Sequence, residues 1–459
     1  MKDLTTGPVS RHLLATTGFM LVMMVFQTLY FLIDLYWVGR LGTAAVAGVS
    51  IAGQLSFIVL ALGQMLGVGA TTLISHASGR RDPAEAGHLF NQALGLSLAV
   101  ALGFLVIGLA GLDAYTRAMA ADAATAAAAR AYLTWFVPAM ALQFPLGVMS
   151  AALRGTGQFR APMIVSTVSV TVNMVLAPFL IFGWVTGRPL GVAGAAISSL
   201  VSIVVALAWL STHFTGAGAW LRFSRPDARP RLATWRRLLG IGLPAGFEFA
   251  MMALYQAVVY TLARPFGAAE QAGFGIGMRV IQATFMPVVA LGFAVAPVAG
   301  QNVGARLPER VRAVFRDAVL MATGVMLVLT AAVHLWAHGM VQFFTPDPAV
   351  VRAGTVYLRI ISWNFVASGM IFVASSLFQA LGNTIPSLLA SSLRMALVIV
   401  PAIILSRLPG FQMTWIWILS AASVWLQLGL SLALLRREFT RRLGPAAVPV
   451  PLAAAGVQG

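Results

Sequence analysis

The sequence contains no cysteine, which excludes disulfide bonds, thiol catalysis and metal sites with cysteine ligands. Charge is also scarce, because only 9% of the 459 residues are Asp, Glu, Lys or Arg, whereas a soluble globular domain usually carries about 25%. Acidic residues are fewer than basic ones, with 13 Asp and Glu against 30 Lys and Arg in the whole chain. Hydrophobic residues make up 59% of the sequence. A chain with this balance has too much apolar surface for a soluble fold, so we predict an integral membrane protein.

Apolar runs of about 20 residues recur from Leu13 to the region of Trp425, and each can cross a hydrocarbon core about 30 Å thick. The runs lack the alternation of membrane β-strands and are rich in Ala, Leu, Gly and Met, so we expect helices. We expect no cleavable signal peptide, because the first run is too long for one and the N-terminus lacks a small-residue cleavage site. We predict about twelve spans, near 13–38, 46–75, 88–111, 130–153, 162–183, 191–213, 239–263, 271–300, 314–337, 355–379, 386–408 and 413–435.

The formal net charge of +17 raises the question of a nucleic-acid partner. The basic residues instead sort by side of the membrane. If the N-terminus is cytoplasmic, the inner segments hold most of them, from Lys2 and Arg11 to Arg441 and Arg442, and the outer segments hold only a minority. This bias predicts that both termini lie in the cytoplasm, in a bacterial-type plasma membrane. We therefore expect contacts with membrane lipids and no binding of nucleic acid.

The two halves of the chain share residues at one constant offset of 225. The pairs include Arg11 with Arg236, Gly42 with Gly267, Gly79 with Gly304, Arg81 with Arg306, Pro83 with Pro308, and Gly157 with Gly382. Six helices per repeat is an even number, so both copies enter the membrane in the same direction. We predict an all-α integral membrane fold in which two parallel-repeat lobes of six helices surround a central cleft.

The longest basic stretch lies near the midpoint and separates the predicted lobes. The predicted parts are an N-terminal lobe at 1–214, a basic cytoplasmic connecting segment at 215–238, a C-terminal lobe at 239–436, and a disordered cytoplasmic tail at 437–459.

Six stretches, in their order and spacing, resemble the multidrug and toxic compound extrusion (MATE) transporters over essentially the whole chain. They are "YFLIDLYWVGRLG" (30–42), "SAALRGTGQFRAP" (150–162), "VNMVLAPFLIFG" (172–183), "GIGMRV" (275–280), "FMPVVALGFAVAPVAGQNVGAR" (285–306) and "SSLFQALGNTIPSLLASSLR" (375–394). The pattern is closer to the DinF-like than to the NorM-like members. The resemblance implies a cation-coupled antiporter that expels drug-like, often cationic and amphipathic molecules.

Asp34 is an ionisable residue inside the first predicted helix, where such groups are functional candidates because burying a charge in lipid is unfavourable. Tyr30 lies one turn back on the same helical face, so its hydroxyl can reach the carboxylate or what the carboxylate binds. A poorly hydrated cleft disfavours the charged form, so Asp34 could take up a proton outside and release it inside, or pair with a cationic drug. It also matches the aspartate of the first helix in MATE transporters. The alternative is a solvated residue close to the headgroups.

Asn173 matches an asparagine in the fifth helix of the family, which implies a hydrogen bond to Asp34. Without the resemblance, a hydrogen bond that only holds two helices together is an equal alternative. In the DinF-like members a second aspartate follows one turn later, but this chain has Ala177 there. Asp34 is therefore the only carboxylate that we expect inside the helices of the N-terminal lobe, and a relay of two carboxylates is in doubt.

Glu248 and Arg394 lie at similar predicted depths in the second half. One alternative is an ion pair that fastens the C-terminal lobe, and the other is a second proton or cation site at Glu248. The NorM-like members place their acid one turn further along, near Met252, and carry another acid in the segment that corresponds to 361–378. Both acids are absent here, so we expect proton coupling rather than sodium coupling.

Three functions compete. The first is a MATE-type drug antiporter, and the second is a flippase for lipid-linked precursors, which typically has extra helices and a cationic cleft. The third is a membrane enzyme, which would need clustered catalytic residues that the sequence lacks. We predict the antiporter, acting as a monomer without a cofactor on small amphipathic or cationic substrates.

Overall fold

The computed structural model describes residues 1–184, 187–216, 218–224 and 226–444, so Arg225 and the predicted tail from 445 onward lie outside it. Twelve helices in this part of the chain are long and apolar enough to cross a membrane, and the described residues contain no β-strand. The predicted fold class and the number of spans are confirmed.

The first half contains seven α-helices: α1 (Val9–Gly39), α2 (Thr43–Gly79), α3 (Pro83–Ala110), the short α4 (Leu112–Met119), α5 (Ala123–Gly155), α6 (Arg160–Phe182) and α7 (Val192–Thr212). The second half contains α8 (Leu232–Ala263), α9 (Ala268–Gly304), α10 (Pro308–Gln342), α11 (Pro348–Ile361), α12 (Phe365–Ala380), α13 (Ile385–Leu405) and α14 (Met413–Leu443). Three 3₁₀ turns complete the described elements: η1 (Pro226–Ala228), η2 (Arg264–Phe266) and η3 (Ser362–Asn364).

The offset of 225 recurs in the positions where the helices begin. α2 and α9 begin at Thr43 and Ala268, α3 and α10 at Pro83 and Pro308, α5 and α11 at Ala123 and Pro348, and α6 and α13 at Arg160 and Ile385. The local geometry is repeated as well. Arg81 and Arg306 are the two residues other than glycine with a positive φ in the described chain, at 58° and 57°. The two halves are therefore copies in structure, although few of their residues are identical.

Matched residues also begin the paired helices. The Asp122 carboxylate accepts a hydrogen bond from the Thr125 amide at the start of α5, and its repeat partner Asp347 accepts one from the Ala349 amide at the start of α11. Such caps satisfy amide groups that have no partner inside the helix. The copies differ in continuity, because α5 runs unbroken through Pro138 whereas η3 separates α11 from α12 at the same place in the repeat.

Several predicted boundaries differ from the observed helices; α5 and α11, for example, begin at Ala123 and Pro348 rather than near 130 and 355. Differences at α8 and α14 change the predicted parts of the chain. α8 begins at Leu232 rather than near 239, so the end of the predicted connecting segment is already helical. α14 continues to Leu443, so residues 437–443 of the predicted tail are helical. Hydropathy fails at both places because arginine-rich turns extend these helices beyond the apolar run.

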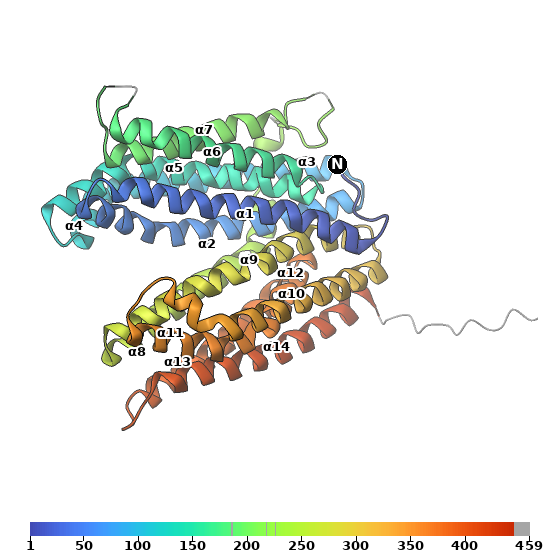
Figure 1. Ribbon diagram of the computed structural model, residues 1–459. Coiled ribbons are helices and arrows are strands. Elements are labelled where there is room, and N and C mark those ends of the chain that lie inside the picture. The colour runs from blue at the N-terminus through green and yellow to red at the C-terminus, as the bar shows by residue number, and fades with distance from the viewer. Residues whose placement is uncertain (185–186, 217, 225, 445–459) are drawn as a thin grey trace, which may run out of the picture.

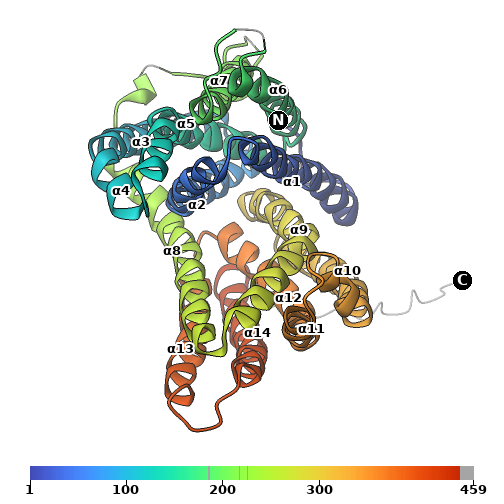
Figure 2. The ribbon, with the colours of Figure 1, turned by 60° about the vertical axis from the view of Figure 1, so that its left-hand side comes forward.

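The helices form two groups, α1–α7 and α8–α14, which lie closest at the end where the N-terminus lies (Figure 1; Figure 2). We call this end the basic end, because arginines of several elements lie there. Arg81 pairs with Asp3 and Arg310 donates to the Gly7 carbonyl near the start of the chain, and Arg442 near the end of α14 donates to the Leu381 carbonyl after α12. The first residues of the chain enter the seam between the groups. The amide of Leu4 donates to the Gln301 side chain of α9 and the amide of Lys2 donates to the Thr156 carbonyl after α5.

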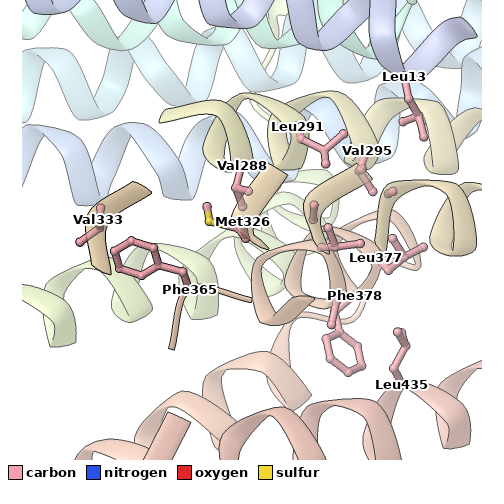
Figure 3. Packing of buried hydrophobic residues seen from close by; sticks show 14 of the residues in the cluster. Leu13, Val288, Leu291, Val295, Met326, Val333, Phe365, Leu377, Phe378 and Leu435 are labelled. Carbon is pink, nitrogen blue, oxygen red and sulfur yellow. The ribbon is translucent and has the colours of Figure 1, made fainter. Parts of the chain in front are cut away.

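The largest apolar cluster belongs to the second group but includes Leu4, Val9 and Leu13 from the start of the chain. Figure 3 shows Leu13 of α1 beside Leu291 and Val295 of α9. Burial of such side chains is the main favourable term in folding in water, whereas inside lipid close packing takes its place. The N-terminal end of α1 therefore joins both groups.

The segment between the groups is held against α3 by side chains of one helical turn. Asn91 donates to the Arg222 carbonyl, Gln92 donates to the Asp227 carbonyl, and the His88 ring lies 2.9 Å from the Asp227 carboxylate. This hydrogen bond from His88 holds the pKa of the Asp227 carboxyl below its usual range. The connection between the two groups is thus fixed to the first group up to the start of α8.

Candidate functional site

Asp34 lies in α1, five residues before the end of the helix at Gly39. Its Oδ1 atom is buried and has no hydrogen-bond partner among the described residues. The hydroxyls of Tyr30 and Tyr132 lie within electrostatic range of this carboxylate. Most buried polar atoms are paired, so an unpaired carboxylate oxygen points to a partner that binds there, such as a proton or a cation.

A chain of hydroxyl and amide groups lies next to Asp34. The Tyr30 hydroxyl is 3.0 Å from Ser199 Oγ, and the Asn173 amide donates to Ser198 Oγ and Ser199 Oγ, each at 3.2 Å. The Asn173 carbonyl oxygen Oδ1 is buried and has no partner in the described chain. α1, α6 and α7 therefore each contribute polar side chains to one small region of the first lobe.

This arrangement corrects one expectation, because the Asn173 amide donates to serines of α7 rather than to Asp34. The Tyr30 hydroxyl bonds Ser199 in the structure, so of the two alternatives for Tyr30, contact with a group that Asp34 binds stays a prediction. The reason is the packing of α6 against α7, which brings Ser198 and Ser199 to within hydrogen-bond distance of Asn173. Two acceptor oxygens, from Asp34 and Asn173, are left unpaired.

Ala177 occupies the place of the second aspartate of the DinF-like pattern and is buried in an apolar cluster with Val38 and Ala195. One proton bound to Asp34 would neutralise its carboxylate, so a single carboxylate in this lobe is sufficient for a proton site. A divalent cation such as Ca²⁺ or Mg²⁺ would need several further oxygen ligands, and the described residues contain no group of three or more His, Asp or Glu side chains that could hold a metal ion.

A second polar cluster lies in the C-terminal lobe, between α8, α13 and α14. The Glu248 carboxylate accepts hydrogen bonds from Ser391 Oγ at 2.5 Å and Ser387 Oγ at 3.3 Å. The Gln427 amide donates to Ser391 Oγ at 3.1 Å, and its own Oε1 atom is buried without a partner in the described chain. Glu248 is thus held by hydroxyl groups.

Arg394 does not pair with Glu248. The ion pairs of the described residues do not include these two groups, and the Arg394 guanidinium carbon lies 5.7 Å from the centre of the Tyr255 ring. A cation over an aromatic face is attracted by the electron density of the ring. Of the two sequence alternatives for this pair of residues, the ion pair is not formed in the structure.

The MatE family model matches residues 20–179 and 244–404, which together cover most of both halves. The chain belongs to the MATE family. It is similar to the multidrug export protein MepA of Staphylococcus haemolyticus, with 25% identity over 79% of this chain and 80% of that protein. It is also similar to an FAD transporter of Shewanella oneidensis, with 24% identity over 87% of this chain and 89% of that protein.

Solved MATE structures share the fold. A MOP superfamily transporter from Pyrococcus furiosus covers 95% of this chain at 23% identity with a TM-score of 0.87, and 97% of that chain is matched. The outward-facing conformation of a multidrug resistance MATE family transporter covers 95% of this chain, and 97% of its own, at 23% identity with a TM-score of 0.88. The relatives of this MATE protein are transporters, not enzymes.

Sequence reasoning missed the serines that hold both polar clusters of this MATE chain, Ser198 and Ser199 in the first lobe and Ser387 and Ser391 in the second. A weak signal was present, because both pairs interrupt apolar helices, and Ser387 and Ser391 are spaced by four residues so that they face one side of the helix. Serine is too common in membrane helices for this signal to decide.

The contacts of Glu248 predict how charge changes in the second cluster will behave. Glu248→Gln keeps an acceptor for the serine hydroxyls, so we expect it to stay folded with a melting temperature in detergent close to that of the parent. Glu248→Leu leaves the Ser391 and Ser387 hydroxyls without their acceptor, which costs roughly 1–3 kcal/mol. The charge-swapped pair Glu248→Arg/Arg394→Glu should not recover the parent melting temperature. Full recovery in the swap alone would show an ion pair instead.

Proposed function

We propose that this protein exports drug-like, often cationic amphipathic compounds in exchange for an inward flow of protons. The unpaired carboxylate of Asp34 carries this proposal, because it is an ionisable group inside a membrane helix with a buried oxygen that no protein group satisfies. The similarity to MepA, a multidrug export protein, supports the substrate class. Binding of a proton and binding of a cationic substrate both neutralise the same charge, so each weakens the other, and this exclusion couples their movements.

We further propose that the basic end faces the cytoplasm of a bacterial-type plasma membrane, with both termini on that side. Arginines gather at this end, and membrane proteins retain such residues on the cytoplasmic side. The two lobes, 1–214 and 239–436, would then move as bodies on either side of the substrate path. With this orientation, the contacts between the lobes at the basic end would close the cytoplasmic side.

The direct test is transport by purified protein in liposomes. With an imposed pH gradient, acidic on the outer face of the protein, we expect efflux of a fluorescent cationic dye from the cytoplasmic face, at the same rate with and without Na⁺. We expect no dependence on Na⁺ because the two acids of the NorM-like pattern, near Met252 and in 361–378, are absent from this chain. Dye movement that requires Na⁺ and does not depend on the pH gradient would show that Na⁺, and not the proton, is the coupled ion.

One comparison favours a second substrate class. The FAD transporter is matched over as much of its length as the drug exporters, so a flavin nucleotide should be tried as a competitor of the dye. Inhibition by FAD together with its own uptake would favour nucleotide transport. A flippase of lipid-linked precursors is a weaker alternative, since the predicted number of spans leaves no extra helices.

A further inference from the structure

Two hydrogen bonds at the basic end join the lobes in a repeat-related way. His76 of α2 places its Nε2 atom 2.6 Å from the Ala380 carbonyl oxygen at the end of α12. Gln301 of α9 donates from Nε2 to the Gly155 carbonyl oxygen at the end of α5, at 3.0 Å. His76 and Gln301 are separated by the repeat offset of 225, and so are Gly155 and Ala380. A carbonyl oxygen can only accept, so both side chains act as donors across the seam.

The backbones around these two side chains also approach in a reciprocal way. A Cβ atom on Gly79 would lie 2.0 Å from the Gln301 carbonyl oxygen, and a Cβ atom on Gly304 would lie 2.1 Å from the His76 carbonyl oxygen. Gly79 and Gly304 are again repeat partners. Each glycine therefore makes room for the turn that carries the opposite side chain, and α2 and α9 cross at this point.

We infer that His76 and Gln301 are paired positioning residues that hold the lobes together at the basic end, and that opening of this end breaks both hydrogen bonds in one movement. Both donors bind a backbone carbonyl of the opposite lobe, so neither bond can survive separation of the lobes. The His76 side chain is half-buried and the Gln301 side chain is buried, so water cannot readily replace either hydrogen bond. Because the two hydrogen bonds are related by the repeat, each lobe supplies one donor and one acceptor. When the lobes separate about the repeat axis, each lobe loses the same two contacts.

The two hydrogen bonds, from His76 to Ala380 and from Gln301 to Gly155, differ in one respect. Gln301 also accepts a hydrogen bond from the amide of Leu4 through Oε1 at 3.0 Å, and its neighbour Asn302 donates to the Leu4 carbonyl at 3.3 Å. Gln301 therefore joins three segments: α9, the end of α5 and the start of the chain. Loss of Gln301 should open the basic end more than loss of His76.

This inference rests on the proposed rocking of two lobes, so its test uses neither substrate nor ion. The natural chain has no cysteine, and Thr72 of α2, which is buried and donates to the Gln379 carbonyl across the seam, offers a reporter position. In a Thr72→Cys background, the rate of alkylation by a small maleimide follows the population with separated lobes. Ser97→Cys, at a fully buried serine of α3, reports unfolding in parallel.

We expect His76→Ala and Gln301→Ala each to raise the alkylation rate at position 72 by roughly threefold to tenfold, the effect of one lost hydrogen bond. His76→Gln, which gives the first repeat the amide of the second, should restore most of the protection. Gln271→Ala is the matched control, because Gln271 lies on α9 and donates to the Tyr260 carbonyl within one lobe.

Unchanged alkylation in both alanine variants, with position 97 protected, would overturn the inference. If an alanine variant fails to fold, His76→Gln alone is decisive, because it keeps a donor toward the Ala380 carbonyl and leaves the contacts of Gln301 with Gly155 and Leu4 in place. A fast rate in His76→Gln, again with position 97 protected, would equally contradict the inference. If transport is coupled to an ion other than the proton, the alkylation rates at position 72 should still be as expected. The proposal of proton coupling and the inference about His76 and Gln301 can therefore fail separately.

Discussion

Asp34→Asn should abolish dye efflux driven by a pH gradient, reducing it to the level of protein-free liposomes. The change keeps the size of the side chain and removes its ability to exchange a proton, so folding should persist while coupling is lost. The Asp34 oxygen without a hydrogen-bond partner makes the loss large, since no neighbouring group in the described chain can take over its charge. The measurement is the initial rate of efflux in the same liposomes used for the parent.

The matched control for Asp34→Asn is Asp113→Asn. Asp113 lies on α4, is half exposed and pairs with Arg130 at 2.6 Å, outside the two polar clusters. A surface ion pair contributes little to stability, about 0–1 kcal/mol, so transport should be unchanged. Normal transport by Asp34→Asn would remove Asp34 from the coupling mechanism. A downhill leak of dye through Asp34→Asn that the pH gradient does not accelerate would support the role of Asp34 in coupling.

Gly242→Ala should produce the second largest effect, a clear fall in melting temperature. A Cβ atom at Gly242 in α8 would lie 1.9 Å from the Met65 carbonyl oxygen in α2, far inside any allowed contact. Gly246, one turn later, approaches the Ala61 carbonyl oxygen in the same way at 2.7 Å. Overpacking of this kind costs roughly 1–3 kcal/mol, and here two backbones would have to separate. Thermal unfolding of the protein in detergent measures the change.

Gly240→Ala is the internal control, because it lies in α8 and a Cβ atom there would meet nothing within 4 Å. Alanine is the better helix former by about 1 kcal/mol, so this variant should be as stable as the parent or more so. Equal melting temperatures for Gly242→Ala and Gly240→Ala would show that α2 and α8 do not depend on the close approach.

The sequence predicts the spans of this protein because lipid imposes one length on each apolar run. The repeat offset carried further information, since it anticipated that α9 and α10 would begin 225 residues after α2 and α3. Hydropathy could not predict the helical turns before Leu239 and after Arg436, where arginine side chains extend into the aqueous boundary. Nor did it predict α4, which lies between the predicted spans 88–111 and 130–153, because this short helix carries Asp113 and Arg117 and forms no apolar run.

The candidate sites were only partly predictable, for a different reason. Asp34, Asn173 and Glu248 stand out as polar residues in apolar helices, and a sequence displays that directly. Their partners depend on the rotation of the neighbouring helices, which decides that Asn173 meets Ser198 and that Glu248 meets Ser391. Arg394 shows the limit most clearly, because equal depth in the membrane predicted Glu248 as its neighbour and packing placed it over Tyr255.

The two left-handed arginines, Arg81 and Arg306, bear on the ancestry of the chain. A positive φ is unfavourable for any residue with a side chain, and glycine would relieve it. Both copies nevertheless keep arginine with nearly the same angle, while most of the surrounding residues have diverged. The turn has the same form in both copies, as expected of a chain built by duplication of one half.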